Sequence, residues 1–63
     1  MFTFVFVDNK NGHYEKGTWI NVLVDKIEAN LASEAADIFE AKHNINLNAN
    51  PHIVFYKEQT NGT

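Results

Sequence analysis

Apolar residues of the types found in β-strands are concentrated in three stretches of the chain. Residues 2–7 read Phe-Thr-Phe-Val-Phe-Val, and this aromatic and β-branched run predicts a strand. Both of its faces are apolar except at Thr3, which indicates a central strand that is covered on both sides. Residues 18–24 and 52–56 are also rich in such side chains and are predicted to form the second and third strands.

A polar segment between the first two strands predicts a hairpin connection. Residues 8–12 read Asp-Asn-Lys-Asn-Gly, and these residue types favour close turns and positive φ angles. Because Asn11-Gly12 is a strong turn dipeptide, we expect the chain to turn there and a longer loop to continue through Gly17.

Residues 25–30 fit either of two structures. They extend the second strand if a bulge near residues 25–26 returns Ile27 to the core face. Alternatively, they begin the helix early, because Ile27 shares the spacing of the apolar helix positions that follow. The strand extension is favoured, with Asn30 as the helix N-cap, since Asn accepts hydrogen bonds from the first free amides of a helix.

An amphipathic pattern over residues 31–43 predicts one helix. Its apolar stripe has the spacing i, i+4, i+7, i+8 and i+11, and it consists of Leu31, Ala35, Ile38, Phe39 and Lys42. Asn44 is expected to end the helix in the left-handed conformation. Acidic side chains are expected to form a surface around this helix, made of Glu28, Glu34, Asp37 and Glu40.

The predicted order of elements is β-β-α-β, an α+β fold with a three-stranded antiparallel sheet and one helix packed on one face. The strand order 2-1-3 makes every adjacent pair antiparallel and the crossover right-handed. We expect residues 1–57 to form this single domain and residues 58–63 to form a flexible C-terminal tail.

One helix covers only one face of such a sheet. The covered face is expected to bury Phe4, Phe6, Ile20, Val22, Val24, Ile53 and Phe55. The opposite face would then carry Thr3, Val5, Val7, Trp19, Leu23, His52, Val54 and Tyr56. Large exposed apolar patches mark interaction sites, and Trp and Tyr are enriched in binding hot spots. We therefore predict a protein-binding surface made of Trp19, Leu23, Val54, Tyr56, Val5 and Val7, unless loops or the tail cover this face.

Composition limits the functions open to this chain. It has 63 residues, no Cys, no Arg and a formal charge of −3. A domain of this size is marginally stable alone, so a dimer or a binding partner is the most available source of added stability. The absence of Arg and the acidic balance disfavour direct nucleic-acid binding. No apolar run is long enough for a membrane span and no basic secretory leader is present, so we expect a cytoplasmic protein.

The residue types that carry catalysis are present but are not arranged for it. The three His residues, at 13, 43 and 52, fall in a turn, a helix end and a strand, with no close-spaced pair of metal ligands. Ser33 is the only Ser and lies on the exposed face of the helix, which argues against a Ser-His-Asp nucleophile. We therefore expect no cofactor, no metal and no enzymatic activity.

Four short motifs follow one another over about residues 4–42. They are Phe4-Val5-Phe6, Asp8-Asn9-Lys10-Asn11-Gly12, Ile20-Asn21-Val22-Leu23-Val24, and the step from Glu28-Ala29-Asn30 into Ser33-Glu34-Ala35-Ala36. In this order they resemble small β-β-α proteins encoded by tailed bacteriophages. The resemblance implies a short non-catalytic protein that binds and inhibits a host enzyme, a transcription component or a defence system in the host cytoplasm.

Three functions are therefore open. The first is a phage-type protein that inhibits a host or bacterial-defence protein. The second is a homodimeric structural or regulatory module. The third is a nucleic-acid mimic, in which the acidic surface around the helix imitates the phosphates of a duplex.

Overall fold

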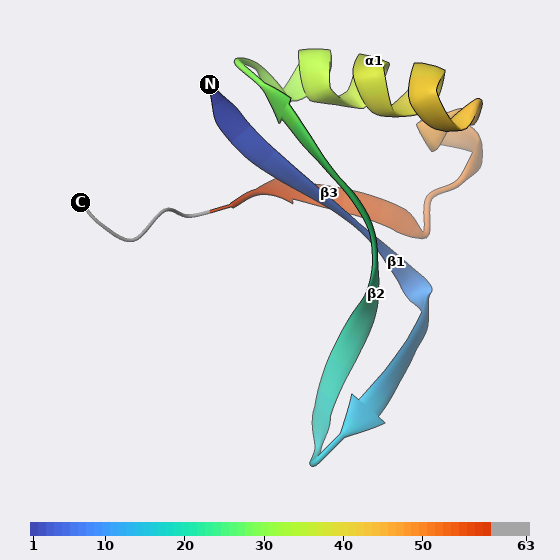
Figure 1. Cartoon of the computed structure of the whole chain (residues 1–63). Helices are drawn as coiled ribbons and strands as arrows, with labels where there is room; N and C mark the ends of the chain where they lie inside the picture. The colour runs from blue at the N-terminus through green and yellow to red at the C-terminus, as the bar shows by residue number, and fades with distance from the viewer. Residues whose placement is uncertain (59–63) are drawn as a thin grey trace.

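In the computed structural model, which describes residues 1–58, a three-stranded antiparallel sheet carries one helix on one face (Figure 1). The elements are, in chain order, β1 (Phe2–Glu15), β2 (Thr18–Ala29), α1 (Ala32–His43), the short 3-10 helix η1 (Leu47–Ala49) and β3 (Ile53–Lys57). The strands lie in the order β2-β1-β3, and both pairs are antiparallel. The prediction of an α+β fold with the order 2-1-3 is confirmed. Of the predicted flexible tail, residues 59–63 lie outside the described residues.

The hairpin between β1 and β2 turns at Lys16-Gly17, and the expectation of a turn at Asn11-Gly12 is wrong. Glu15 pairs with Thr18, so only two residues connect the strands. Lys16 and Gly17 have φ angles of 51° and 82°. Positive φ at both central residues is what a two-residue turn of this hand requires, and Gly adopts it without a steric penalty.

The polar segment after Asp8 forms a wide bulge within β1 instead of the turn. Asp8 and His13 pair with β2 on either side of residues 9–12, where the register shifts. The carboxylate of Asp8 accepts the backbone amides of Lys10 and Asn11 at 2.9 and 3.2 Å, so it satisfies donors that the regular ladder would otherwise pair. A further hydrogen bond, from the side chain of Asn11, is the main reason why the pKa of Asp8 is lowered.

An aromatic core joins α1 to the sheet. The ring of Phe6 on β1 stacks on those of Phe39 and Phe55, with centroids 4.1 and 4.7 Å apart. The buried core cluster consists of Phe4, Phe6, Ile27, Ala29, Ala35 and Phe39. The residues that pack against it are Val24, Ile45, Leu47, Ile53 and Phe55. Five predicted core residues are thereby confirmed, namely Phe4, Phe6, Val24, Ile53 and Phe55.

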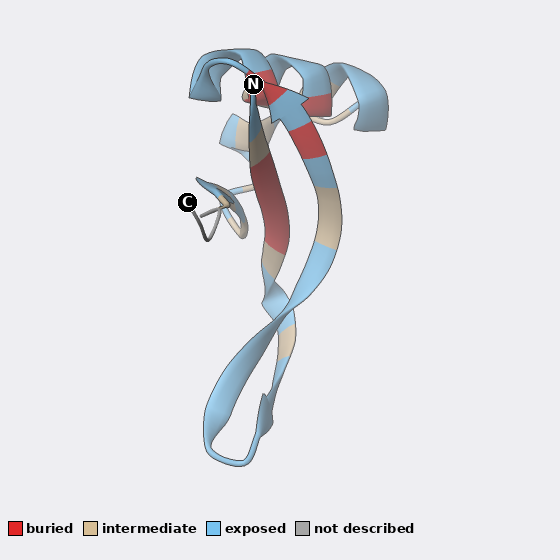
Figure 2. Cartoon of the chain, turned by 60° about the vertical axis from the view of Figure 1, so that its left-hand side comes forward, coloured by how far each residue is buried: buried red, intermediate tan, exposed pale blue. Residues whose placement is uncertain are grey.

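Ile20 and Val22 are exposed, at 40% and 43%, which corrects their assignment to the core. The 12 residues of α1 span about 18 Å, whereas the 12 residues of β2 span about 40 Å. The helix therefore covers only the end of β2 near Ala29. The far end of the β1–β2 hairpin extends beyond it as a two-stranded ribbon, and Figure 2 shows that this ribbon has no buried residue. We call residues 9–23 the arm.

Residues 25–29 continue β2, as favoured from the sequence. Leu23 pairs with Val7 and Asp25 pairs with Phe6, so Val24 is the extra residue of a bulge. This bulge returns Ile27 to the core face, where it is 5% exposed.

The two ends of α1 differ in how well the sequence predicted them. Leu31, not Asn30, occupies the N-cap position, and an aliphatic side chain cannot cap a helix. Glu34 reaches back instead, and its Oε1 accepts the amide of Asn30 at 3.0 Å. At the other end, Asn44 has φ 53° and ψ 50°, the predicted left-handed conformation.

The apolar stripe predicted for the helix is only partly buried. Ala35 and Phe39 are buried, whereas Leu31 and Ile38 are exposed. The sheet lies on one side of α1, and the segment with η1 packs near its C-terminal end (Figure 1). Apolar residues outside these contacts therefore face outward.

Candidate functional site: an apolar hollow on the open face

No helix or strand among residues 1–58 covers the face of the sheet opposite α1 (Figure 1). Val5 and Val7 of β1 point to this face. Side chains alternate along a strand, and the neighbouring Phe4 and Phe6 face the helix. Val5 pairs with Tyr56 of β3, and Val7 pairs with Leu23 of β2 and Val54 of β3. All three strands thus contribute side chains to this surface, which we call the open face.

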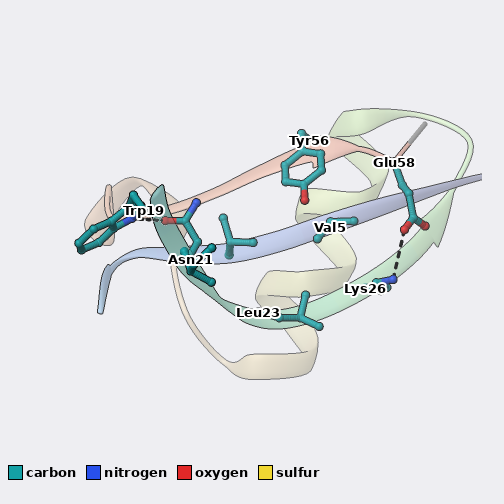
Figure 3. Close-up of a pocket in the computed structure, with 9 residues that line it drawn as sticks. Val5, Trp19, Asn21, Leu23, Lys26, Tyr56 and Glu58 are labelled. Carbon is teal, nitrogen blue, oxygen red and sulfur yellow. Dashed lines mark hydrogen bonds and ion pairs between the residues drawn. The ribbon is translucent and has the colours of Figure 1, made fainter. Parts of the chain in front are cut away.

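A hollow of about 380 Å³ lies on the open face. Val5 and Val7 form its floor and are only 4% and 6% exposed, although no second layer of the described chain lies over them. Figure 3 shows that its walls come from β2 on one side and from the end of β3 on the other. The lining residues of the walls are Trp19, Ile20, Asn21, Leu23, Lys26, Tyr56 and Glu58. An apolar floor with a polar and aromatic rim is typical of the centre of a protein interface.

An ion pair closes one end of the hollow. Nζ of Lys26, on β2, lies 3.2 Å from Oε1 of Glu58, which follows β3 (Figure 3). The backbone of Glu58 is held by its amide, which donates to the carbonyl of Thr3 at 2.8 Å. Both charged side chains are close to half exposed, so the pair adds little stability and its charges remain accessible to a partner.

Trp19 stands at the other end of the hollow and is positioned by the arm. Its indole Nε1 donates to Oδ1 of Asn21, and its ring meets that of Tyr14 edge to face at 5.0 Å between centroids. Gly12 lies against the same ring, because a Cβ atom at Gly12 would come within 2.8 Å of it. The position of Trp19 therefore depends on a glycine in the bulge of the neighbouring strand.

The structure brings together five of the six residues predicted to bind protein, namely Trp19, Leu23, Tyr56, Val5 and Val7. Val54 lies on the same face but outside the hollow. The two valines of β1 form the floor, whereas Leu23, Val54 and Tyr56 are between 42% and 56% exposed and can contact a partner directly.

Sequence reasoning missed four residues of the rim. Lys26 belongs to the segment that fitted both strand and helix, and Glu58 was assigned to the tail. Ile20 was assigned to the core, but it lies in the arm beyond the end of the helix, where it is 40% exposed and borders the hollow. Asn21 shares its face of β2 with Trp19, but its hydrogen bond to the indole depends on a side-chain orientation that alternation does not specify. Lys26 could have been placed at the hollow if its pairing with Val5 had been known.

The four carboxylates expected around the helix do not form one acidic surface. Glu28 lies on β2, and because its neighbour Ile27 is buried it points to the open face. Glu34 and Glu40 lie on α1 and accept backbone amides from the loops at the two ends of the helix, at 3.0 and 2.8 Å. Asp37 is exposed on the helix. Glu34 and Glu40 therefore bind backbone amides of this chain, and Glu28 lies on the other side of the sheet.

A cluster of charged groups fastens β2 to the end of α1. Oδ2 of Asp25 lies 2.8 Å from both Nζ of Lys42 and Nε2 of His43. The hydrogen bonds from Lys42 and then His43 are the main reasons why the pKa of Asp25 is lowered to about 2. A carboxylate with so low a pKa is a weak general base at neutral pH, and its contacts with Lys42 and His43 join β2 to the end of the helix.

Among residues 1–58, no three His, Asp or Glu side chains gather closely enough to hold a metal ion. In the same part of the chain, no helix has the length and apolar character needed to cross a membrane. Comparison with protein-family models, curated proteins and solved structures finds no match to this chain. The function of the protein is therefore inferred from its own residues, and the hollow on the open face is the candidate binding site.

Proposed function

We propose that this protein is a non-catalytic binding protein that docks another protein on its open face and inhibits it. The observation that carries this proposal is the hollow, whose floor of two buried valines is surrounded by the exposed side chains of Leu23 and Tyr56. A partner side chain inserted into such a hollow removes apolar surface from water at the centre of the contact, where binding energy is concentrated.

The open shape of the hollow and the charges on its rim favour a protein partner over a small ligand. The hollow is open to solvent and lies on a sheet face, so it would leave much of a small molecule exposed, whereas such ligands are usually buried over most of their surface. Lys26 and Glu58 place one charge of each sign at one end of the hollow. Charges at the edge of a contact set its orientation and its specificity more than its affinity.

The resemblance of residues 4–42 to small tailed-bacteriophage proteins supports the class of target. A chain of 63 residues inhibits an enzyme or a defence protein most simply by covering a functional surface, because this needs a contact face and no catalytic group. The proposed target is therefore a host or bacterial-defence protein, and the proposed place of action is the host cytoplasm.

Affinity capture from bacterial lysate tests the binding step. The immobilised protein is expected to retain one dominant lysate protein, and Leu23→Asp and Tyr56→Ala are each expected to lose it. Ile38→Asp is the matched control, since Ile38 is exposed to a similar degree but lies on α1. Equal loss with the control variant would move the binding surface away from the open face, and no retained protein at micromolar bait would refute the proposal.

A growth and phage-plating assay tests the inhibition step. Expression of the protein should change host growth or the efficiency of phage plating, and Leu23→Asp should abolish that change. The homodimeric structural or regulatory module is the alternative, and it predicts no such change. The nucleic-acid mimic is tested by Asp37→Lys, because Glu34 and Glu40 serve the fold and their replacement would disturb the helix ends.

A further inference from the structure

The outer edge of β2 offers a second kind of contact, through its backbone, and the side chains of this edge include Trp19 and Leu23 of the open face. In the described sheet β2 lies at one end of the strand order, with β1 as its neighbour, so its other edge offers backbone amides and carbonyls for pairing. In the arm this edge extends beyond α1, and neither the helix nor β3 lies beside it (Figures 1 and 2). A further strand can therefore approach it without displacing any described element.

The part of this edge in the arm lacks the features that prevent strand pairing. Residues 18–24 read Thr-Trp-Ile-Asn-Val-Leu-Val and contain no charge, no Pro and no Gly. Natural edge strands are protected by charged side chains, Pro or bulges. β2 has such protection only from Val24 onward, where the bulge is followed by Asp25, Lys26 and Glu28. The contrast within one strand indicates that the first half of the edge is covered.

We propose that a second copy of this chain covers it, by antiparallel pairing of the two β2 edges about a two-fold axis at Asn21. In this register Ile20 faces the partner's Val22, and Trp19 faces the partner's Leu23. Each of these contacts occurs twice, as a two-fold interface requires. The pairing joins two arms, each a two-stranded ribbon that would be marginal alone, into a four-stranded sheet.

The exposure of the arm fits this arrangement. All four apolar side chains of this edge are exposed, and alternation along the strand places Ile20 and Val22 on one side of the arm and Trp19 and Leu23 on the other. Antiparallel pairing places each of them beside an apolar side chain of the other copy, at the distance at which cross-strand pairs interact. Since the segment carries no charge, two chains that each have a formal charge of −3 meet where their repulsion is weakest.

Asn21 contributes to the register of this pairing, together with the apolar pairs that flank it. Its Oδ1 accepts from the indole of Trp19, and a carbonyl oxygen has a second lone pair that can accept from the amide of the partner's Asn21. A slip of two residues would place each Asn21 opposite an apolar side chain, and its side-chain amide would lose the hydrogen bond to the other copy. A polar residue on a symmetry axis favours one register because every other register leaves it unpaired.

The oligomeric state of the purified protein tests the dimer without any other partner. Sedimentation equilibrium from about 1 to 200 μM is expected to show a monomer–dimer equilibrium. Val22→Lys places a charge opposite the partner's Ile20 and should raise the dissociation constant by about 30-fold or more. That factor corresponds to a loss of about 2 kcal/mol in the free energy of association. Val54→Lys is the matched control, as Val54 is equally exposed but lies on β3. A parent protein that is monomeric throughout this range, or that forms larger oligomers, would overturn the proposal.

Cross-linking tests the position of the axis. The chain has no Cys, so Asn21→Cys places a single thiol where the two copies face each other. Directly opposite residues have Cβ atoms about 4.5–5.5 Å apart, and a shift of the strands of about 1 Å brings them to the spacing of a disulfide. Mild oxidation should convert it to a covalent dimer, whereas Glu28→Cys, also exposed on β2, should remain largely monomeric. Circular dichroism establishes that both variants are folded. Equal cross-linking at both positions, or a parent dimer that does not cross-link at position 21, would place the interface elsewhere.

Discussion

The ring of Phe6 lies parallel to that of Phe39, with 4.1 Å between centroids and 3° between planes. Phe6 comes from the central strand and Phe39 from the helix, and neither has any exposed surface. Phe6 also stacks on Phe55 of β3, so one side chain connects three elements. In a domain with so small a core, this contact carries a large share of the stability.

Phe6→Ala is therefore expected to unfold the protein. Truncation of a buried Phe costs about 3–5 kcal/mol, which is as much as a core of this size supplies in total. A thermal scan by circular dichroism should show no cooperative transition. Phe2→Ala is the control, because Phe2 is exposed and should keep a transition close to that of the parent. A parent-like transition in Phe6→Ala would mean that the stacked pair does not hold the helix to the sheet.

Asp25→Asn is expected to lower stability in a pH-dependent way. The pKa of Asp25 is about 2 in the folded protein and 3.8 in the reference state. Its stabilisation is therefore fully present above about pH 4–5 and is lost as the pH falls from 3.8 through 2. Urea titrations should give a difference between parent and variant of about 1 kcal/mol at neutral pH, which closes near pH 2. Asp37→Asn, on the exposed helix face, should show little difference at any pH. If the difference in free energy of unfolding between parent and variant persisted at pH 2, the ion pairs of Asp25 would not be its cause.

Substitutions in the hairpin turn should have opposite effects on stability. Lys16 has a positive φ of 51°, which Asn adopts more readily than Lys, so Lys16→Asn should raise the free energy of unfolding by about 0.5 kcal/mol. Gly17→Ala should lower it by about 1 kcal/mol, owing to backbone strain alone, because a Cβ at Gly17 meets no atom of the described chain within 4 Å. Chemical denaturation measures both. Two changes of the same sign would contradict the turn geometry.

Gly12→Ala should displace Trp19. The added Cβ would clash with the backbone carbonyl oxygen of Ile20 and would lie 2.8 Å from the indole ring, so the bulge and the strand segment that carries the ring have to move apart. Trp19 is the only Trp of the chain, and its fluorescence maximum should shift to longer wavelength. Gly17→Ala, at the end of the same arm, should leave the maximum in place. An unchanged spectrum in Gly12→Ala would show that the ring does not rest on this glycine.

The three strands, the helix and their order could be predicted because each depends on residues that are close in sequence or on a general rule of connection. Alternation placed Phe4 and Phe6 on one face and Val5 and Val7 on the other. A bulge near residues 25–26 was expected to return Ile27 to the core, and the structure has this bulge at Val24. The right-handed crossover then left 2-1-3 as the order that makes all pairs antiparallel.

The position of the hairpin turn could not be predicted, because two segments competed for it. Asn11-Gly12 has the stronger local preference, whereas Lys16-Gly17 allows the two strands to pair over a greater length. The added pairing from Glu15 back to His13 outweighs the preference of a dipeptide, and Asp8 satisfies the amides of the bulge that results.

By itself, the sequence determined which side chains share a face of each strand, because alternation follows from the backbone alone. Only the tertiary structure decided which parts of those faces are buried. The helix spans less than half the length of β2, so Phe6 and Ile27 lie beneath it while Ile20 and Val22 extend past its end. The rim of the hollow was decided in the same way, since Lys26, Glu58 and Trp19 border one hollow above β1 only after strand pairing has brought together residues far apart in the chain.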